Sequence, residues 1–189
     1  MTGTDGRDSD QGQFHGIYPM LYAFFDRDGE LDRQAMRVQV KGALAQGVHG
    51  IAVGGLATET NKLSTEERAT LMAWAVEDVA GQVPLSVTIA ESNVKGQTAM
   101  AQLAADLGAS WVVLQPPPVR GASEAALIDF YGMVADGSPL PVGIQNAPEY
   151  IGIGVSNAGF AELHRRHPNI SILKAEGPAT YIAALSEDT

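Results

Sequence analysis

The sequence of 189 residues contains no cysteine, which excludes disulfides, thiolate nucleophiles and thiolate-bound zinc. Basic residues are also few, with 12 lysines and arginines against 22 acidic residues and a formal net charge of −10. Because a nucleic-acid-binding protein needs a basic face, we expect no nucleic-acid partner. No apolar run approaches the roughly 18 residues that span a bilayer, so we expect no membrane partner either.

Length and composition favour one soluble globular domain. Hydrophobic residues make up 45% and charged residues 18% of the chain, a balance that argues against a disordered protein. Residues 1–13 are polar and rich in Gly and Asp, and they lack the basic start and apolar centre of a signal peptide. We therefore predict a disordered tail over residues 1–13, a folded domain over residues 14–189 and a cytoplasmic protein.

Short apolar runs alternate with longer segments of helical spacing. Most of the runs are rich in Val, Ile and Leu without polar alternation, which is typical of strands buried on both faces of a parallel sheet. Six runs are predicted as strands: Ile17–Phe25, Gly50–Gly54, Pro84–Ala90, Trp111–Leu114, Pro141–Gln145 and Ile170–Lys174.

The segments between these runs are predicted as helices, with a sixth helix beginning near Pro178. One begins at Ser64, where Ser64-Thr65-Glu66-Glu67 matches a capping box. Gly47 and Gly108 stand where helix C-caps belong. The other predicted helices cover Asp32–Gln46, Lys95–Leu107, Ser123–Ala135 and Ser156–His167, and the helix that begins at Ser64 extends to about Ala80.

Regular alternation of strand and helix predicts an α/β fold with a parallel sheet and right-handed crossovers. An open doubly wound sheet and a (β/α)8 TIM barrel both fit this pattern. The first strand–helix junctions contain neither G-x-G-x-x-G nor G-x-x-x-x-G-K-[ST], which disfavours a Rossmann nucleotide site and favours the barrel.

The length is short for a complete barrel. An eight-unit barrel typically needs about 250 residues, whereas this chain offers six strands and the start of a sixth helix. We therefore expect a barrel truncated to about six βα units and incomplete at the C-terminus. Either the chain is a fragment or something else supplies the missing wall, and composition does not distinguish the two.

Functional residues of a parallel barrel gather at the carboxyl ends of its strands, where Lys174 is the most informative residue. The chain has four lysines, and only Lys174 ends an apolar strand. Ile172 and Lys174 share one face because side chains alternate along a strand. If that face is the barrel lumen, desolvation favours the neutral amine, which can attack a carbonyl and form an imine. The alternative is a lysine that snorkels to water.

Two other strand ends carry candidate groups. The turn Gly54–Glu59 could hold a carboxylate on successive backbone N–H groups, or it could be a tight turn without a ligand. Gln145 and Asn146 could hydrogen-bond an oxygenated substrate, or they could simply form a turn. His164 and His167 lie beside two arginines near a helix C-terminus, a setting that favours cations, so we predict no metal site.

Together these strand ends resemble the dihydrodipicolinate synthase/N-acetylneuraminate lyase family of (β/α)8 aldolases. The resemblance runs from about Gly16 to Gly177 and is specific in its order and spacing. Lys174 stands where the family has its lysine, at the end of the sixth strand. The other matching segments are Gly16–Asp32, Gly47–Ile51, Gly55–Glu59 and Leu63–Arg68, the last two similar to the family signature GTTGE…LSxEER.

The resemblance implies a lyase that acts on a 2-oxo acid, pyruvate or a 2-keto-3-deoxy sugar acid, through a Schiff base on Lys174. The reaction would be aldol cleavage, condensation or dehydration, without a metal or an organic cofactor. It further implies a homo-oligomer, a tetramer or a dimer.

Several departures from the family pattern bear on activity. Leu56 and Ala57 replace the two threonines that help to bind the substrate carboxylate. Binding of the carboxylate would then depend on the backbone N–H groups from Gly55 onward and on the hydroxyl of Thr58. Gln145 replaces the catalytic tyrosine, and Tyr150 replaces an arginine that binds a dicarboxylate.

These losses argue against authentic dihydrodipicolinate synthase activity. Glu176 shares the face of Lys174 in extended geometry, where it could act as an acid and base, bind a substrate hydroxyl or remain a surface carboxylate. We predict Lys174, Gln145 and Glu176 as catalytic, and Asn146 with the Gly55 loop as substrate-binding. The alternative is a non-catalytic or truncated family member, acting as a binding protein or an inactive fragment.

Overall fold

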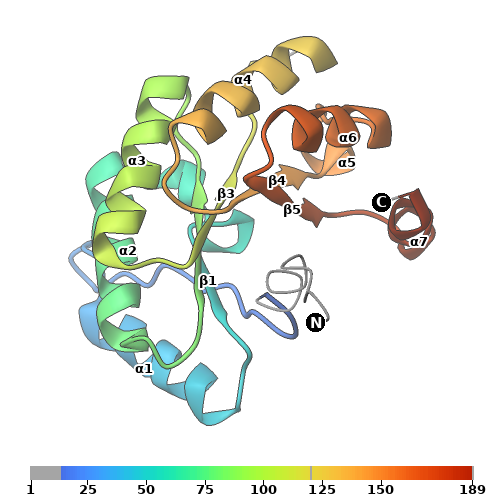
Figure 1. Ribbon diagram of the computed structural model, residues 1–189. Coiled ribbons are helices and arrows are strands. Elements are labelled where there is room, and N and C mark those ends of the chain that lie inside the picture. The colour runs from blue at the N-terminus through green and yellow to red at the C-terminus, as the bar shows by residue number, and fades with distance from the viewer. Residues whose placement is uncertain (1–13, 120, 189) are drawn as a thin grey trace, which may run out of the picture.

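The computed structural model describes residues 14–119 and 121–188 and shows an α/β fold built on one parallel sheet (Figure 1). The predicted disordered tail over residues 1–13 lies outside the described residues. Five strands lie side by side in chain order, and all four pairings are parallel. They are β1 (Ile51–Val53), β2 (Leu85–Ile89), β3 (Trp111–Leu114), β4 (Val142–Asn146) and β5 (Ile170–Ala175).

All six predicted helices are present. Ser64 accepts a hydrogen bond from the Glu67 backbone N–H at 3.1 Å and Glu67 accepts one from the Ser64 N–H at 2.7 Å, which confirms the capping box. Gly108 ends its helix at a φ of 102°, a left-handed conformation that glycine adopts readily. The helices are α1 (Arg33–Ala45), α2 (Thr65–Val79), α3 (Val94–Leu107), α4 (Glu124–Asp136), α6 (Asn157–Arg166) and α7 (Ala179–Asp188).

Three short turns of helix were not predicted. They are η1 (Leu56–Thr58), η2 (Thr60–Lys62) and α5 (Pro148–Ile151), which follow the carboxyl ends of β1 and β4. Each is too short to show helical periodicity, so the hydrophobic pattern that identified the longer helices carries no signal for them.

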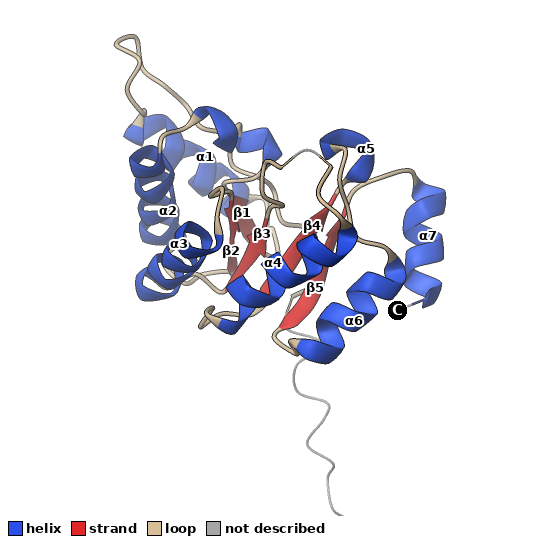
Figure 2. Ribbon diagram, turned by 90° about the horizontal axis from the view of Figure 1, so that it is seen from above, coloured by secondary structure: helices blue, strands red, loops and turns tan. Residues whose placement is uncertain are grey.

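The helices cover one face of the sheet. Helix α2 packs against both α1 and α3, and α4 packs against both α3 and α6. Figure 2 shows them as an arc that runs from α1 past α4 to α6. In a doubly wound sheet the strand order reverses and helices cover both faces. The sequential strand order and the single layer of helices therefore favour the singly wound barrel.

The side chains that alternate along the strands separate into two sets. The set that faces the helices forms the main hydrophobic core, and in β2 it consists of Leu85, Val87 and Ile89. On the other face, Trp111 of β3 contacts Tyr18, with ring centroids 6.0 Å apart. Because the Tyr18 segment and β3 are separated by β1 and β2, this contact spans the inner face and is consistent with a curved sheet.

The predicted strand Ile17–Phe25 is wrong in its extent. This segment runs beside β1 but pairs with it at a single bridge, Met20 with Ala52. Further on, the backbone N–H and C=O of Tyr22 bond the Gln39 side chain, at 2.8 and 3.1 Å, in place of a neighbouring strand. The six βα units are thus present, but the first has only a bridge where a strand was expected.

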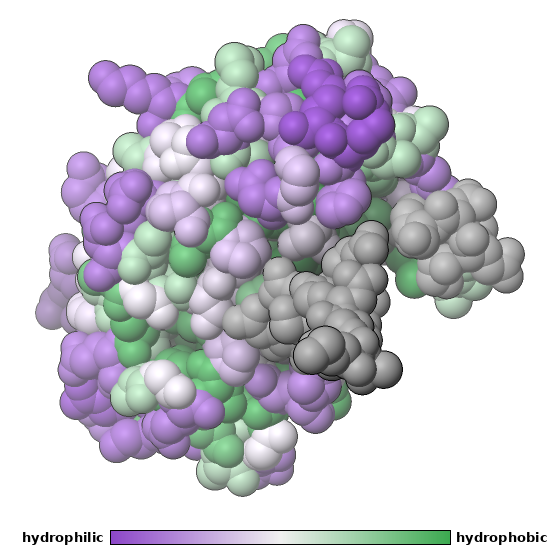
Figure 3. Space-filling model, viewed as in Figure 1, coloured by the Kyte–Doolittle hydropathy of each residue, from purple (hydrophilic) through white to green (hydrophobic). Residues whose placement is uncertain are grey.

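The surface in the view of Figure 3 mixes hydrophilic side chains along the helical rim with apolar ones nearer the middle. Within the described residues, no helix combines the length and the apolar character needed to cross a membrane.

Candidate active site

Lys174 lies at the carboxyl end of β5, on the inner face of the sheet. A Cβ added to Gly143 would lie 3.2 Å from the Trp111 ring and 3.3 Å from Cγ2 of Ile172, so these residues share that face. Lys174 follows Ile172 by two residues and pairs in register with Gln145 of β4. Its side chain is 28% exposed, so the amine is partly withdrawn from solvent but accessible.

The amine of Lys174 has a carboxylate as its neighbour. Nζ of Lys174 donates a hydrogen bond to Oε1 of Glu176, and Nε2 of Gln145 donates to the same oxygen at 3.1 Å. The backbone N–H of Glu176 bonds the Asn146 carbonyl at 2.9 Å, which keeps Glu176 beside the strand end. The structure therefore brings the three residues predicted as catalytic into one cluster, in which a carboxylate can receive a proton from the lysine.

Gln145 retains an unused acceptor in this cluster. The residue is 2% exposed, and its Oε1 has no hydrogen-bond partner among the described residues. A buried amide oxygen without a partner is costly. A hydroxyl or a water molecule that enters next to Lys174 would find an acceptor there.

Asn146 is not part of this cluster, because adjacent residues of a strand point to opposite faces. Its Nδ2 donates to the Val155 carbonyl and to the Tyr181 hydroxyl, both at 3.0 Å, and its Oδ1 accepts from the Val155 N–H at 3.0 Å. These bonds tie β4 to the segment before α6 and to α7. The geometry accounts for Asn146 as a structural residue.

The loop after β1 lies at the same end of the sheet as Lys174. Gly54 adopts a φ of 81°, and its N–H donates to the Thr58 hydroxyl at 3.1 Å. That hydroxyl in turn donates to the Leu21 carbonyl at 2.6 Å and is buried. Thr58 thus closes the loop internally, while Leu56 and Ala57 are exposed at the start of η1. The first N–H groups of such a turn have no partner within it.

Sequence reasoning missed two polar groups on the inner face. Oγ1 of Thr88 and Nε1 of Trp111 are buried without a hydrogen-bond partner among the described residues. In β2, Ser86 and Thr88 alternate with apolar residues. That alternation marks a strand with one polar face and could have identified this lining.

Tyr18 does not take the place of the catalytic tyrosine that the resemblance leads us to expect at the position of Gln145. It lies beside Gly50, which precedes β1, and beside Trp111, the first residue of β3. Both positions are at the amino ends of the strands, opposite to Lys174. Burial raises the pKa of the Tyr18 phenol, which favours its neutral form.

The described residues contain no cluster of three or more His, Asp or Glu side chains that could hold a metal ion. His164 and His167 point to different partners. Nδ1 of His164 lies 2.8 Å from the Ile170 carbonyl, and Nδ1 of His167 lies 2.6 Å from Oδ1 of Asp136.

Comparison with solved structures shows the same fold over most of the chain. YagE, an E. coli prophage protein of the dihydrodipicolinic acid synthase family in complex with pyruvate, matches with a TM-score of 0.88 and 27% identity, covering 93% of this chain and 59% of its own. A catalytic lysine mutant of Ruminococcus gnavus sialic acid aldolase matches with a TM-score of 0.87 and 22% identity, covering 94% and 59%.

Sequence comparison points to the same family. A 4-hydroxy-tetrahydrodipicolinate synthase of Exiguobacterium sibiricum is 31% identical over 173 residues, which are 91% of this chain and 59% of the relative. One of Stenotrophomonas maltophilia is 34% identical over 171 residues, 90% and 57% respectively. The chain thus spans less than two thirds of the length of these relatives. The model of the dihydrodipicolinate synthetase family matches residues 13–187, and the chain belongs to that family.

Proposed function

We propose that this chain carries the reactive lysine of a Schiff-base-forming lyase that acts on a 2-oxo acid. The observation that carries the proposal is the cluster of Lys174, Glu176 and Gln145 at the carboxyl ends of β5 and β4. Family membership supports it, as do a structural relative bound to pyruvate and another described as having a catalytic lysine.

In the proposed reaction, the neutral amine of Lys174 attacks the C2 carbonyl carbon of the substrate. Glu176 receives the proton that the ammonium must lose first, since its carboxylate contacts Nζ. The C2 oxygen takes up one proton from the attacking nitrogen and one from protonated Glu176 and leaves as water, which gives a protonated imine. That imine accepts the electron pair of a breaking C3–C4 bond in cleavage, or the pair left when C3 loses a proton in dehydration or condensation.

Gln145 would hold Glu176 and place a water or a substrate hydroxyl. Its Nε2 is already bonded to the carboxylate, and its Oε1 is the unused acceptor. An amide does not titrate as a phenol does, so Gln145 can orient a proton donor but does not relay a proton itself. Proton transfer would therefore fall to Glu176.

The substrate carboxylate would bind the loop that begins at Gly55. Leu56 and Ala57 provide no hydroxyls, and the hydroxyl of Thr58 is engaged in closing the loop. The N–H of Gly55 donates to the Met20 sulfur at 3.3 Å, so binding would rest mainly on the backbone N–H groups of Leu56 and Ala57, as successive amides can hold an anion. We further propose one barrel domain over residues 14–189 and a homo-oligomer.

The test is reduction with borohydride in the presence of pyruvate, and separately of a 2-keto-3-deoxy sugar acid, followed by peptide mass mapping. We expect a reduced adduct on Lys174 and none on Lys41, Lys62 or Lys95, which serve as internal controls. Lys174→Arg should abolish the adduct.

A second candidate is a non-catalytic family member that binds a 2-oxo acid or has lost the reaction. The amide at Gln145, where the family has a tyrosine, favours it. Adduct formation with no turnover of any substrate would support this second candidate. No adduct with either class of 2-oxo acid would contradict the proposed chemistry.

A further inference from the structure

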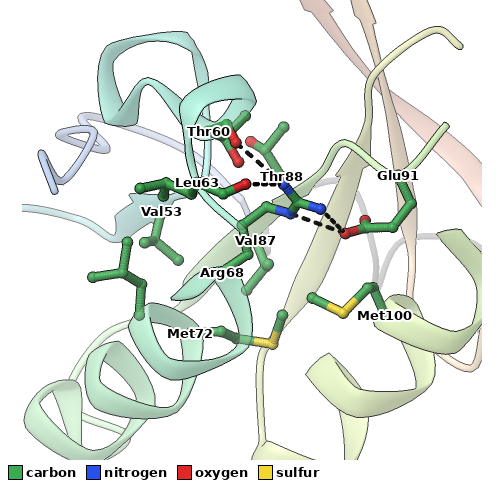
Figure 4. Close-up of a pocket in the computed structure, with 11 residues that line it drawn as sticks. Val53, Thr60, Leu63, Arg68, Met72, Val87, Thr88, Glu91 and Met100 are labelled. Atoms are coloured by element: carbon green, nitrogen blue, oxygen red, sulfur yellow. Dashed lines mark hydrogen bonds and ion pairs between the residues drawn. The ribbon is translucent and has the colours of Figure 1, made fainter. Parts of the chain in front are cut away.

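The loop after β1 is held from below by Arg68, a residue of α2 that points into the protein (Figure 4). One guanidinium nitrogen donates to the Leu63 carbonyl at 2.6 Å and to the Thr60 carbonyl at 3.3 Å. The other terminal nitrogen donates to Oγ1 of Thr65 at 3.0 Å. A single side chain thus supplies hydrogen-bond donors to acceptors in η2, just after it and at the start of α2. This region is the far end of the loop that begins at Gly54.

Arg68 also connects this loop to the next one. Its Nε and a terminal nitrogen both lie 3.0 Å from Oε1 of Glu91, which follows β2. The two side chains are 17% and 9% exposed, so the ion pair is largely withdrawn from water. A guanidinium suits this position because it presents several donors in a fixed plane, which an ammonium does not.

A small cavity lies behind the pair, lined mostly by apolar side chains but with a few polar groups. Oγ1 of Thr60 and Oε2 of Glu91 are buried and have no hydrogen-bond partner among the described residues. Both residues line a space of about 10 Å³, with Arg68 at its side. That volume accommodates about one water molecule, and a buried water usually makes two to four hydrogen bonds. The charge of Glu91 is already balanced by Arg68, so a neutral ligand fits better than a cation.

We propose that Arg68, Glu91 and one buried water form a positioning cluster that fixes the loop from Gly54 to Leu63. The effect of this cluster on substrate binding rests on the proposed function, because the carboxylate of the 2-oxo acid would bind at this loop. In the loop, Leu56 and Ala57 are exposed and contribute no hydroxyls. The direction of its backbone N–H groups therefore depends on how its two ends are anchored, and Arg68 anchors the far end.

The first test is hydrogen–deuterium exchange of the intact protein. Arg68→Lys keeps the charge but loses the planar donors, and Arg33→Lys is the matched control. Arg33 is also a partly buried guanidinium with two bonds to a carboxylate, Asp78, but it lies on α1. We expect faster exchange over residues 54–63 in Arg68→Lys and unchanged exchange there in Arg33→Lys. Unchanged exchange over these residues in a folded Arg68→Lys would overturn the proposal.

The second test separates positioning from a merely structural role. The pyruvate concentration that gives half-maximal borohydride trapping should rise roughly tenfold in Arg68→Lys, while trapping at saturation stays at the wild-type extent. If Arg68→Lys shows faster exchange in the loop but the same half-saturating pyruvate concentration as the wild type, Arg68 has only a structural role. That result would overturn its role in positioning the loop for substrate.

The outcomes for the two proposals remain distinguishable. If the wild-type protein traps no 2-oxo acid, the proposed function fails, and the exchange experiment alone decides whether Arg68 fixes the loop. If Arg68→Lys does not fold, Glu91→Gln takes its place, since it keeps the shape of the side chain and removes the charge that orients the guanidinium. A high-resolution crystal structure should show one water bonded to Thr60 and Glu91, and a cation there would contradict the neutral ligand.

Discussion

Replacement of Glu176 by glutamine tests the chemistry of the lysine cluster most directly. The change keeps the size of the side chain and an oxygen that can face Nζ of Lys174, but it removes the group that accepts the lysine's proton. Loss of a positioned general base typically costs about 10²–10⁴-fold in rate. Because the Glu176 side chain is 27% exposed, water can partly replace it, so we expect the lower end, about 100-fold.

The measurement is the time course of imine trapping at saturating pyruvate, sampled by mass spectrometry. The rate should fall in Glu176→Gln while the final extent of labelling of Lys174 stays the same. Glu149→Gln is the control, because Glu149 is an exposed carboxylate on α5, after the neighbouring strand. A trapping rate for Glu176→Gln within about twofold of wild type would refute the assignment of Glu176 as the proton acceptor.

Two predictions concern stability. Hydrogen bonds from Arg33, and to a lesser degree from Arg37, hold the pKa of the Asp78 carboxyl below its ordinary value. The ionised Asp78 carboxylate therefore stabilises the folded state at pH values above the unfolded-state pKa. This stabilisation is lost as the pH falls through the lower, folded-state pKa. Asp78→Asn should lower the free energy of unfolding by about 2 kcal/mol at neutral pH and reduce its decline in acid, and urea unfolding at pH 7 and below pH 4 checks both. Ser64→Ala removes one half of a capping box and should cost about 1 kcal/mol in the same assay, whereas an unchanged midpoint would contradict the role of the cap.

The parts of the fold that could be predicted from sequence are those with repeated local signals. Strands β2 to β5 are short apolar runs, and helix α2 begins at a capping box, so both follow from pattern and local hydrogen bonding. The segment Ile17–Phe25 has the composition of a strand, but pairing also needs a neighbour whose backbone groups are free. The Gln39 side chain hydrogen-bonds the backbone N–H and C=O of Tyr22. These residues are 17 positions apart, and nothing local in the sequence reveals the contact.

The candidate site divides in the same way. Alternation along β5 places Lys174 and Ile172 on one face, so the orientation of the lysine was predictable. The same alternation separates Gln145 from Asn146, and applying it to β4 would have assigned Asn146 to the helical side. Arg68 carried no comparable signal, because its partners Thr60, Leu63 and Glu91 are brought together only by the folding of two loops over the strand ends.

The two halves of the proposed site belong to the two outer strands of the described sheet. Lys174 is on β5, and the loop from Gly54 follows β1, so three strands lie between them in the hydrogen-bonded order. A substrate as small as pyruvate can reach both only if the sheet curves, as the ring contact of Tyr18 with Trp111 across the inner face indicates. If labelling of Lys174 saturates with pyruvate, and half-saturation needs more pyruvate in Arg68→Lys than in the wild type, the result would therefore report on the curvature as well as on the chemistry. If the Arg68→Lys change leaves the pyruvate dependence of labelling unaltered, the lysine reacts without help from the carboxylate site in the loop.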